Sequence, residues 1–318
     1  MSQTLVPTLR LRSETGGWLL IAGIMLLAAC WMAAVDLGLD WQSATVPVAV
    51  CLGLESLAIF YRVRRPDERL ATMLTGVAQL VAFTAGAALL SYALARNDLP
   101  FWDETFLSWD RALGLNWRAY LAFVDARPRL GLVFTIAYLS LSIQMVAIVL
   151  ILGMTGRVLA VREFVMAVMI GGLATVLISG ALPAMAMFVH LGLDGSDFPH
   201  LRPAAAFVHV EAVNGLRDGT LKIIALGRLE GIITFPSFHA ALGVIFAHAL
   251  WRLKWIRYPA LALNLVLIAA TPIDGGHYFV DVLAGLAIAA LAIVAARLLV
   301  RRSSSDRLAF CDTVSEPT

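Results

Sequence analysis

Long apolar runs are the feature that most constrains the fold of this 318-residue chain. Hydrophobic residues make up 60% of the sequence and charged residues 14%, whereas a soluble domain is about half apolar and about a quarter charged. A helix that crosses a bilayer needs about 20 predominantly apolar residues. Candidate segments of this kind lie at 18–36, 45–62, 70–95, 129–153, 163–190, 236–252, 258–273 and 278–300. The sequence therefore predicts an all-α, polytopic integral membrane bundle with about eight transmembrane helices.

Basic residues indicate how these segments are oriented. With the N-terminus placed in the cytoplasm, 15 of the 24 Lys and Arg residues fall on the cytoplasmic side, as the positive-inside rule requires. The two short turns on the opposite side, near 37–44 and 272–277, contain none. We therefore expect both termini in the cytoplasm and the loops 96–128 and 191–235 outside. A bacterial inner membrane with an active site on the periplasmic side is the expected location.

Three parts are expected along the chain: a three-helix membrane segment at 1–95, a catalytic membrane domain at 96–303, and a disordered cytoplasmic tail at 304–318. Residues 102–125 mix apolar and polar residues at helical spacing. This pattern predicts an amphipathic helix that either lies on the outer interface or packs as a helix within the loop. Pro183 is expected to kink the fifth segment. The dispersed basic residues do not indicate nucleic-acid binding.

Two histidines stand where helices of the last third are expected to begin. The sixth segment opens with FPSFH at 235–239, and GGHYFVD at 275–281 leads into the eighth. The chain crosses the membrane and returns between these motifs, so His239 and His277 are expected on the same side. Asp281 follows His277 by four residues, which places both on one helical face. The sequence thus predicts a cluster of two histidines and one carboxylate.

Each member of this cluster has a chemical role that suits it. A carboxylate that accepts the N–H of His277 would fix the tautomer and raise the basicity of the other ring nitrogen. His277 is therefore the expected nucleophile or base, Asp281 its orienting partner, and His239 the general acid. A partner or a function is expected for each histidine, because an ionisable side chain inside a membrane is costly.

A phosphate is the expected ligand of this cluster. Ser237 and the free N–H groups at the start of its helix would form an anion site. Candidate cations that precede this helix are Arg217, Lys222 and Arg228, each of which would equally suit an ordinary solvated loop. The set predicts phosphoryl transfer without a metal or other cofactor, so that activity should survive chelators. The alternative is a metal site, because two histidines and one aspartate are enough protein ligands.

These motifs resemble those of the type 2 phosphatidic acid phosphatase superfamily, most closely the branch that contains inositol phosphorylceramide synthases. The resemblance covers the last third well and 102–300 more loosely. It implies that His277 attacks phosphorus and forms a phosphohistidine, that Asp281 orients it, and that His239 protonates the leaving group. Ser237 would bind phosphate oxygens. Water or an alcohol would then accept the phosphoryl group.

The sequence departs from the superfamily pattern at several positions. Lipid phosphatases of this superfamily have glycine where Phe238 stands, and a Ser-Arg pair where Ala270 and Thr271 stand. Their first motif begins with a lysine, and Gly195 occupies that position, although Arg202-Pro203 matches the end of the motif. The last motif without arginine resembles the inositol-phosphoryl transferases more than the simple phosphatases.

The resemblance leaves three functions open. The first is transfer of a phosphorylated head group between a lipid and an alcohol acceptor, and the second is hydrolysis of a lipid phosphate. Both would use the same intermediate and differ only in the acceptor. The third is a non-catalytic lipid-binding or carrier protein that keeps the fold. The presence of His239, His277 and Asp281 argues against the third, because a binding protein does not need a nucleophile.

Overall fold

The computed structural model describes residues 5–314, and their side chains from Thr15 to Arg302. The described chain is helical almost throughout, so the predicted all-α membrane bundle is confirmed. The helices are α1 (Leu5–Ala34), α2 (Trp41–Val63), α3 (Glu68–Ala95), α4 (Asp103–Ala112), α5 (Trp117–Asp125), α6 (Pro128–Leu139), α7 (Leu141–Met154), α8 (Val158–Ala181), α9 (Met187–His190), α10 (His209–Arg217), α11 (Phe238–Leu250), α12 (Arg257–Asp274) and α13 (Phe279–Val314). A short 3₁₀ helix, η1 (Leu226–Arg228), and two strands, β1 (Gly38–Leu39) and β2 (Ile223–Ile224), complete the fold.

Each of the eight predicted membrane segments is helical, but they differ in length. Within the described residues, five helices are long and apolar enough to cross a membrane: α1, α2, α3, α8 and α13. The bent pair α6–α7 makes a sixth if it is one span. Helix α11 has 13 residues and is therefore only about 20 Å long. A helix of this length reaches only part of the way across a bilayer. His239 lies in its first turn.

Local sequence signals explain where several helices begin. The Asp67 carboxylate accepts hydrogen bonds from the backbone N–H groups of Arg69 and Leu70 at the start of α3. Asn116 accepts from the N–H of Ala119 at the start of α5. Such side chains satisfy backbone donors that have no partner within the first helical turn.

Two membrane segments differ from the sequence prediction. The segment expected at 129–153 is broken at Ser140 into α6 and α7, which meet at an angle of 51°. The Ser140 hydroxyl donates to the carbonyl of Ala137, and such back-bonding favours a bend. The prediction that Pro183 kinks the fifth segment is wrong. Helix α8 ends at Ala181 instead, since the residue before a proline disfavours helical backbone angles.

Residues 102–125 form two helices rather than one. A turn with Gly114 at a φ of +72° separates α4 from α5. Asp103, Phe106 and Asp110 of α4 and Trp117 of α5 are buried, so these helices pack into the protein as the second sequence interpretation expected. At the C-terminal end, the sequence predicts a disordered tail from 304. The structure continues α13 to Val314, as a stretch without Gly or Pro allows, and 315–318 lie outside the described residues.

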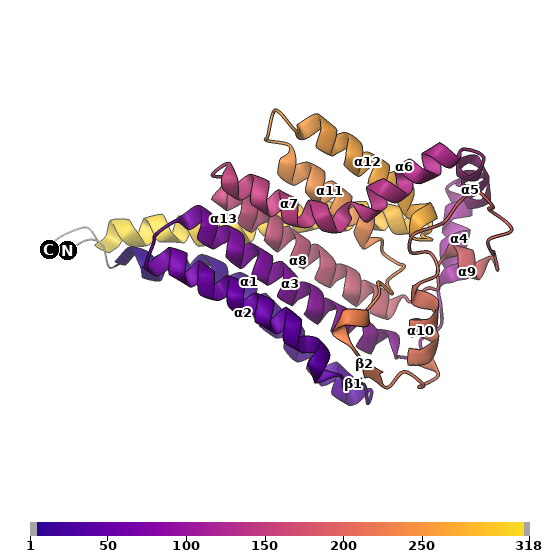
Figure 1. The fold of residues 1–318 in the computed structure, drawn as a ribbon, viewed down its shortest axis with the longest axis horizontal. Helices are drawn as coiled ribbons and strands as arrows, with labels where there is room; N and C mark the ends of the chain where they lie inside the picture. The colour runs from indigo at the N-terminus through magenta and orange to yellow at the C-terminus, as the bar shows by residue number, and fades with distance from the viewer. Residues whose placement is uncertain (1–4, 315–318) are drawn as a thin grey trace.

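The long segment 191–235 packs against the end of the bundle opposite the chain termini (Figure 1). Its strand β2 pairs in parallel with β1, which lies in the turn between α1 and α2. Gly38 N donates to the Lys222 carbonyl at 2.7 Å, and Asp40 N donates to the Ile224 carbonyl at 2.9 Å. These bonds hold the segment across the ends of α2 and α3 before it reaches α11.

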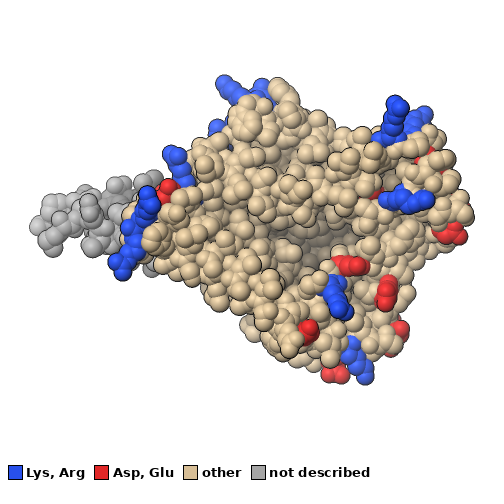
Figure 2. All heavy atoms as spheres, in the orientation of Figure 1, with Lys and Arg blue, Asp and Glu red and all other residues tan. Residues whose placement is uncertain are grey.

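The buried residues form two clusters. One follows the membrane helices α1, α3, α8, α11 and α13. The other lies at the end of the bundle formed by α4, α5, α6 and α9, and includes Phe106, Trp117, Phe188, Phe235 and Tyr278. In Figure 1 this second end lies opposite the chain termini, which are close together. Figure 2 shows basic side chains at both ends of the visible face and most of its acidic side chains at the end opposite the termini.

Candidate active site

His277 lies in a turn between α12 and α13. The turn is sharp because Gly276 adopts a φ of +68°, a conformation that side chains with a Cβ rarely adopt. The indole N–H of Trp117 donates to the His277 carbonyl at 3.2 Å. The imidazole is 3% exposed. Burial lowers its pKa to about 4, and the Thr234 backbone carbonyl opposes this shift. His277 is therefore a neutral base at neutral pH.

Asp281 binds His277 from the first turn of α13. His277 Nδ1 lies 3.2 Å from Asp281 Oδ2, which also accepts the backbone N–H of Tyr278 at 2.9 Å. The carboxylate accepts the Nδ1 proton, so the unprotonated nitrogen of the neutral ring is Nε2. The predicted contact between these two side chains is present at hydrogen-bond distance. The predicted shared helical face is not, because α13 begins at Phe279 and His277 lies in the turn before it.

Two buried carboxylates hold the start of α13 in place. Asp110 of α4 accepts the N–H groups of Phe279 and Val280, both at 2.9 Å. Burial raises the pKa of Asp110, and these two hydrogen bonds oppose the shift. Asp103 accepts the Tyr278 hydroxyl at 2.8 Å and the N–H groups of Met185 and Ala186. The two aspartates therefore hold the three residues that follow His277, Asp103 through the Tyr278 side chain and Asp110 through the backbone of Phe279 and Val280.

His239 lies on the first turn of α11 and faces the same site. Its ring centroid is 6.4 Å from that of His277. The Tyr138 ring stacks on the His239 imidazole at 4.3 Å with an interplanar angle of 11°, and its hydroxyl is 3.5 Å from Nδ1. The two motifs that lie 38 residues apart in the sequence are therefore adjacent, as the crossing and return of the chain predicts.

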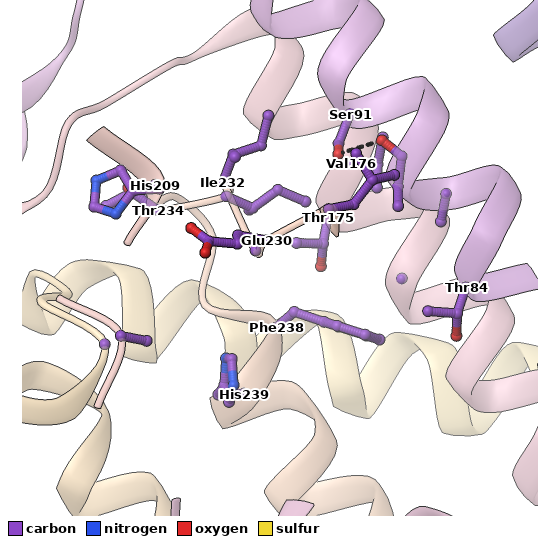
Figure 3. A pocket seen from close by; sticks show the side chains of 18 of the residues that line it. Thr84, Ser91, Thr175, Val176, His209, Glu230, Ile232, Thr234, Phe238 and His239 are labelled. Carbon is purple, nitrogen blue, oxygen red and sulfur yellow. Dashed lines mark hydrogen bonds between the residues drawn. The ribbon is translucent and has the colours of Figure 1, made fainter. Parts of the chain in front are cut away.

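A cavity of about 390 Å³ opens beside the two histidines. His239 and His277 lie on its wall with Tyr138, His209, Thr234 and Phe238. Helices α3 and α8 contribute Phe83, Thr84, Thr175 and other small or apolar residues. Figure 3 shows His239, His209 and Glu230 around this space, with Phe238 extending along it. A phosphate beside His277 would therefore be enclosed by apolar groups.

Ser237 occupies the N-cap position of α11. Its side chain is fully buried and accepts the Ala240 N–H at 3.3 Å, and its own N–H donates to the Asp281 carbonyl at 3.0 Å. It thus joins the starts of α11 and α13. The helix begins at Phe238, two residues after the Pro236 start that the sequence suggests.

The three candidate cations lie away from the cavity wall. The Arg217 guanidinium stacks 3.5 Å from the Phe101 ring centroid and is 4.0 Å from an Asp98 oxygen. Lys222 and Arg228 are exposed. Among the described residues no Lys or Arg lines the 390 Å³ cavity. The structure thus brings together His239, His277 and Asp281 and leaves the predicted cations outside this group.

Several residues of the site have no signal in the sequence. His209 is 4% exposed, lines the cavity and donates from Nε2 to the Met185 carbonyl at 2.7 Å. Burial lowers its pKa. Tyr138 is one aromatic residue within an apolar segment, and Asp103 and Asp110 are acidic residues within a surface-like helix pattern. Only the folded arrangement shows that they surround His277.

The described side chains form no group of three or more His, Cys, Asp or Glu arranged to hold a metal ion. The two histidines face each other across the cavity, while Asp281 binds the far side of His277. The metal-site alternative thus has no preformed set of three such ligands among the described side chains.

A comparison with known families decides the assignment. A model of the PAP2 superfamily matches residues 104–295, more than half of the chain, and this range includes His239, His277 and Asp281. The chain belongs to the PAP2 superfamily. No curated protein and no solved structure matches it significantly. As a PAP2 protein with membrane-spanning helices, it is an integral membrane phosphatase or phosphotransferase that acts on a lipid phosphate.

Proposed function

We propose that this PAP2 enzyme transfers a phosphorylated head group from a lipid donor to an alcohol acceptor. The observation that supports the proposal is the neutral His277, bonded through Nδ1 to Asp281, with His239 facing it across the cavity at 6.4 Å. The last motif lacks the arginine of the simple phosphatases, which favours the branch that contains the inositol phosphorylceramide synthases.

The reaction proceeds in two steps. His277 Nε2 attacks phosphorus, the bond between phosphorus and the lipid oxygen breaks, and His239 donates a proton to the departing alcohol. An acceptor alcohol then attacks the phosphohistidine, His239 takes its proton, and the bond between phosphorus and Nε2 breaks. Asp281 holds the Nδ1 proton throughout. The N-terminus of α11 supplies partial positive charge to the phosphate oxygens.

The walls around the site suit a lipid. A second apolar cavity of about 340 Å³ adjoins the first and shares Thr84, Ala88 and Leu229 with it. Pro47, Val77, Leu80 and Met145 line this second space. A substrate whose phosphate lies beside His277 would place its acyl chains in this adjoining space. We further propose that the active site faces the periplasmic side of a bacterial inner membrane, with both termini in the cytoplasm.

An assay of the full chain in detergent with phospholipids labelled in the phosphate tests the function. Products are separated with and without alcohol acceptors, so that free phosphate and new phospholipids are both measured. We expect new phospholipid in the presence of an acceptor. Release of phosphate alone would favour the phosphatase alternative, and binding without turnover would favour the lipid-carrier alternative.

Single substitutions separate the roles of the two histidines. We expect His277→Ala to abolish turnover and labelling of the protein, because no phosphohistidine can form. His239→Ala should slow transfer by about 10²–10⁴-fold and retain activity with an activated aryl phosphate that needs no proton. Near-normal turnover by His277→Ala, with His239→Ala inactive on every substrate, would reverse the assignment.

A further inference from the structure

Among the described residues, the wall of the 390 Å³ cavity has one acidic side chain and no lysine or arginine. Of the described residues that line it, Glu230 is the one Asp, Glu, Lys or Arg. The phosphate group of the substrate is anionic, yet this wall has a carboxylate and no lysine or arginine. The charge of the wall therefore does not complement the charge of the phosphate. A phosphate without its own counter-charge would be repelled by Glu230 at short range.

Glu230 is held at the cavity by its backbone. Its N–H donates to the Tyr92 hydroxyl at 3.1 Å, and that hydroxyl lies 3.4 Å from the Glu230 carbonyl. Tyr92 belongs to α3 and is 2% exposed, so it provides a fixed point for the 229–234 segment. The Glu230 carboxylate makes no ion pair within the described part of the chain. Figure 3 shows it directed into the space between His209 and His239. Its charge is therefore available to a ligand.

Aromatic rings line the same cavity. Phe238 stands where the usual superfamily motif has glycine, and its side chain lines the wall together with Phe83. Both rings lie against Gly172, where an added Cβ would be 2.6 Å from Phe83 and 3.1 Å from Phe238. Aromatic faces near a carboxylate are a common environment for organic ammonium ions in proteins. This departure from the motif thus adds a surface that suits a cation.

We propose that the cavity selects phospholipids whose phosphate is esterified to an ammonium-bearing alcohol, such as ethanolamine or choline. The ammonium group would meet Glu230 and the Phe238 ring while the phosphate lies beside His277. A zwitterionic head group supplies the positive charge that the wall lacks. This inference deepens the proposed function and rests on it, because it identifies the donor of the transferred head group.

Substitution of Glu230 tests the selection by turnover. The full chain in detergent is assayed with phosphatidylethanolamine, phosphatidylcholine, phosphatidylinositol and phosphatidate as donors. For the wild type we expect the two zwitterionic lipids to be preferred. Glu230→Gln should lower kcat/KM for them by about 10-fold to 100-fold and raise it for phosphatidate, because the carboxylate that repels the phosphatidate phosphate is removed. Glu230→Lys should reverse the preference. Glu211→Gln is the matched control, because Glu211 is exposed, as Glu230 is, but does not line the cavity.

Lipid binding by His277→Ala protein separates this inference from the proposed chemistry. Fluorescent phosphatidylethanolamine is displaced by each unlabelled lipid, in a background with and without Glu230→Gln. Stronger displacement by zwitterionic lipids, lost in the Glu230→Gln background, supports the inference even if turnover shows simple hydrolysis. Displacement by phosphatidate equal to that by the zwitterionic lipids when Glu230 is present, or an unchanged donor preference in Glu230→Gln, would overturn it.

Discussion

The backbone around His277 is bound on three sides before any substrate enters. Trp117 donates to the His277 carbonyl, Asp103 accepts the hydroxyl of the neighbouring Tyr278, and Asp110 accepts two N–H groups that follow. The imidazole adds its own bond to Asp281. These contacts fix the direction of Nε2, and such pre-organisation limits the reorganisation needed at the moment of reaction.

The pH dependence of activity should report the burial of His277. Its pKa is lowered to about 4, so the imidazole stays neutral down to about pH 5. We expect kcat/KM to fall only as the pH decreases through about 4, because protonation of Nε2 removes the nucleophile. The measurement is kcat/KM against pH with a soluble aryl phosphate. An acid limb near pH 6.5, the ordinary range for histidine, would contradict the assignment.

A folding control accompanies this profile. A histidine with a lowered pKa in the folded state binds fewer protons than in the unfolded state. The native state therefore loses stability as the pH falls from about 6.5 toward 4. Size-exclusion chromatography at each pH separates loss of fold from protonation of the nucleophile.

At the residue scale, the sequence predicts those site members that lie in local patterns. His277 and Asp281 are recognisable because they lie four residues apart, although His277 itself lies in the turn before α13. Tyr138, His209 and Asp103 are not, because their place in the site depends on contacts with residues far away in the chain. Tyr138 meets His239 across 101 positions, and Asp103 meets Tyr278 across 175. No local periodicity encodes such pairs.

At the scale of elements, the close approach of α11 and α13 sets the distance between the two histidines. Ser237 N at the start of α11 donates to the Asp281 carbonyl in the first turn of α13. Gly285 lies one turn further on, where an added Cβ would overlap the Ser237 carbonyl oxygen. It would also lie 3.2 Å from Ala240 Cβ and 3.3 Å from Ala241 N. The absence of a side chain at Gly285 thus allows the two helices to touch.

Gly285→Ala should separate these helices and displace His239 from His277. We expect turnover to fall by at least about 10-fold and the native state to lose about 1–3 kcal/mol, as overpacking typically costs. Turnover and thermal unfolding in detergent measure the two effects. Gly53→Ala on α2 is the control, because no atom lies within 4 Å of its added Cβ. Wild-type turnover in Gly285→Ala would show that the contact does not set the site.

The sequence predicts the existence of the membrane helices better than their ends and shapes. Hydropathy locates the apolar helices because burial in lipid or protein requires long apolar runs, but of the eight predicted segments only five, or six with the bent pair α6–α7, are long and apolar enough to span a membrane in the described part of the chain. It does not locate the 51° bend at Ser140, which depends on a side-chain hydrogen bond. It also extends the fifth segment past Ala181, because the residues after Pro183 are still apolar. Composition alone therefore does not predict the helix ends that depend on backbone hydrogen bonding.

At the scale of the whole molecule, the cavity extends across the domain boundary predicted at residue 95. The matched family range begins at 104, yet α3 contributes Phe83, Thr84, Ala88 and Ser91 to the wall. Helix α3 also holds Glu230 through Tyr92. Helix α3 therefore completes the cavity wall. Composition shows only that this helix is apolar and does not predict this contribution.

The membrane orientation of the whole bundle is the last prediction. Short loops on one side of the bundle contain most of the basic residues, and the active-site end lies opposite the termini in Figure 1. Since cytoplasmic loops retain an excess of Lys and Arg, we expect the active-site end to face the periplasm. Single cysteines at Asp218, exposed at the end of α10, and Lys254, exposed between α11 and α12, test this in a chain without Cys30, Cys51 and Cys311. A membrane-impermeant maleimide should label Asp218→Cys in cells with a permeable outer membrane, and Lys254→Cys only after the inner membrane is disrupted. The opposite pattern would place the active site in the cytoplasm and rule out a lipid donor taken from the outer leaflet.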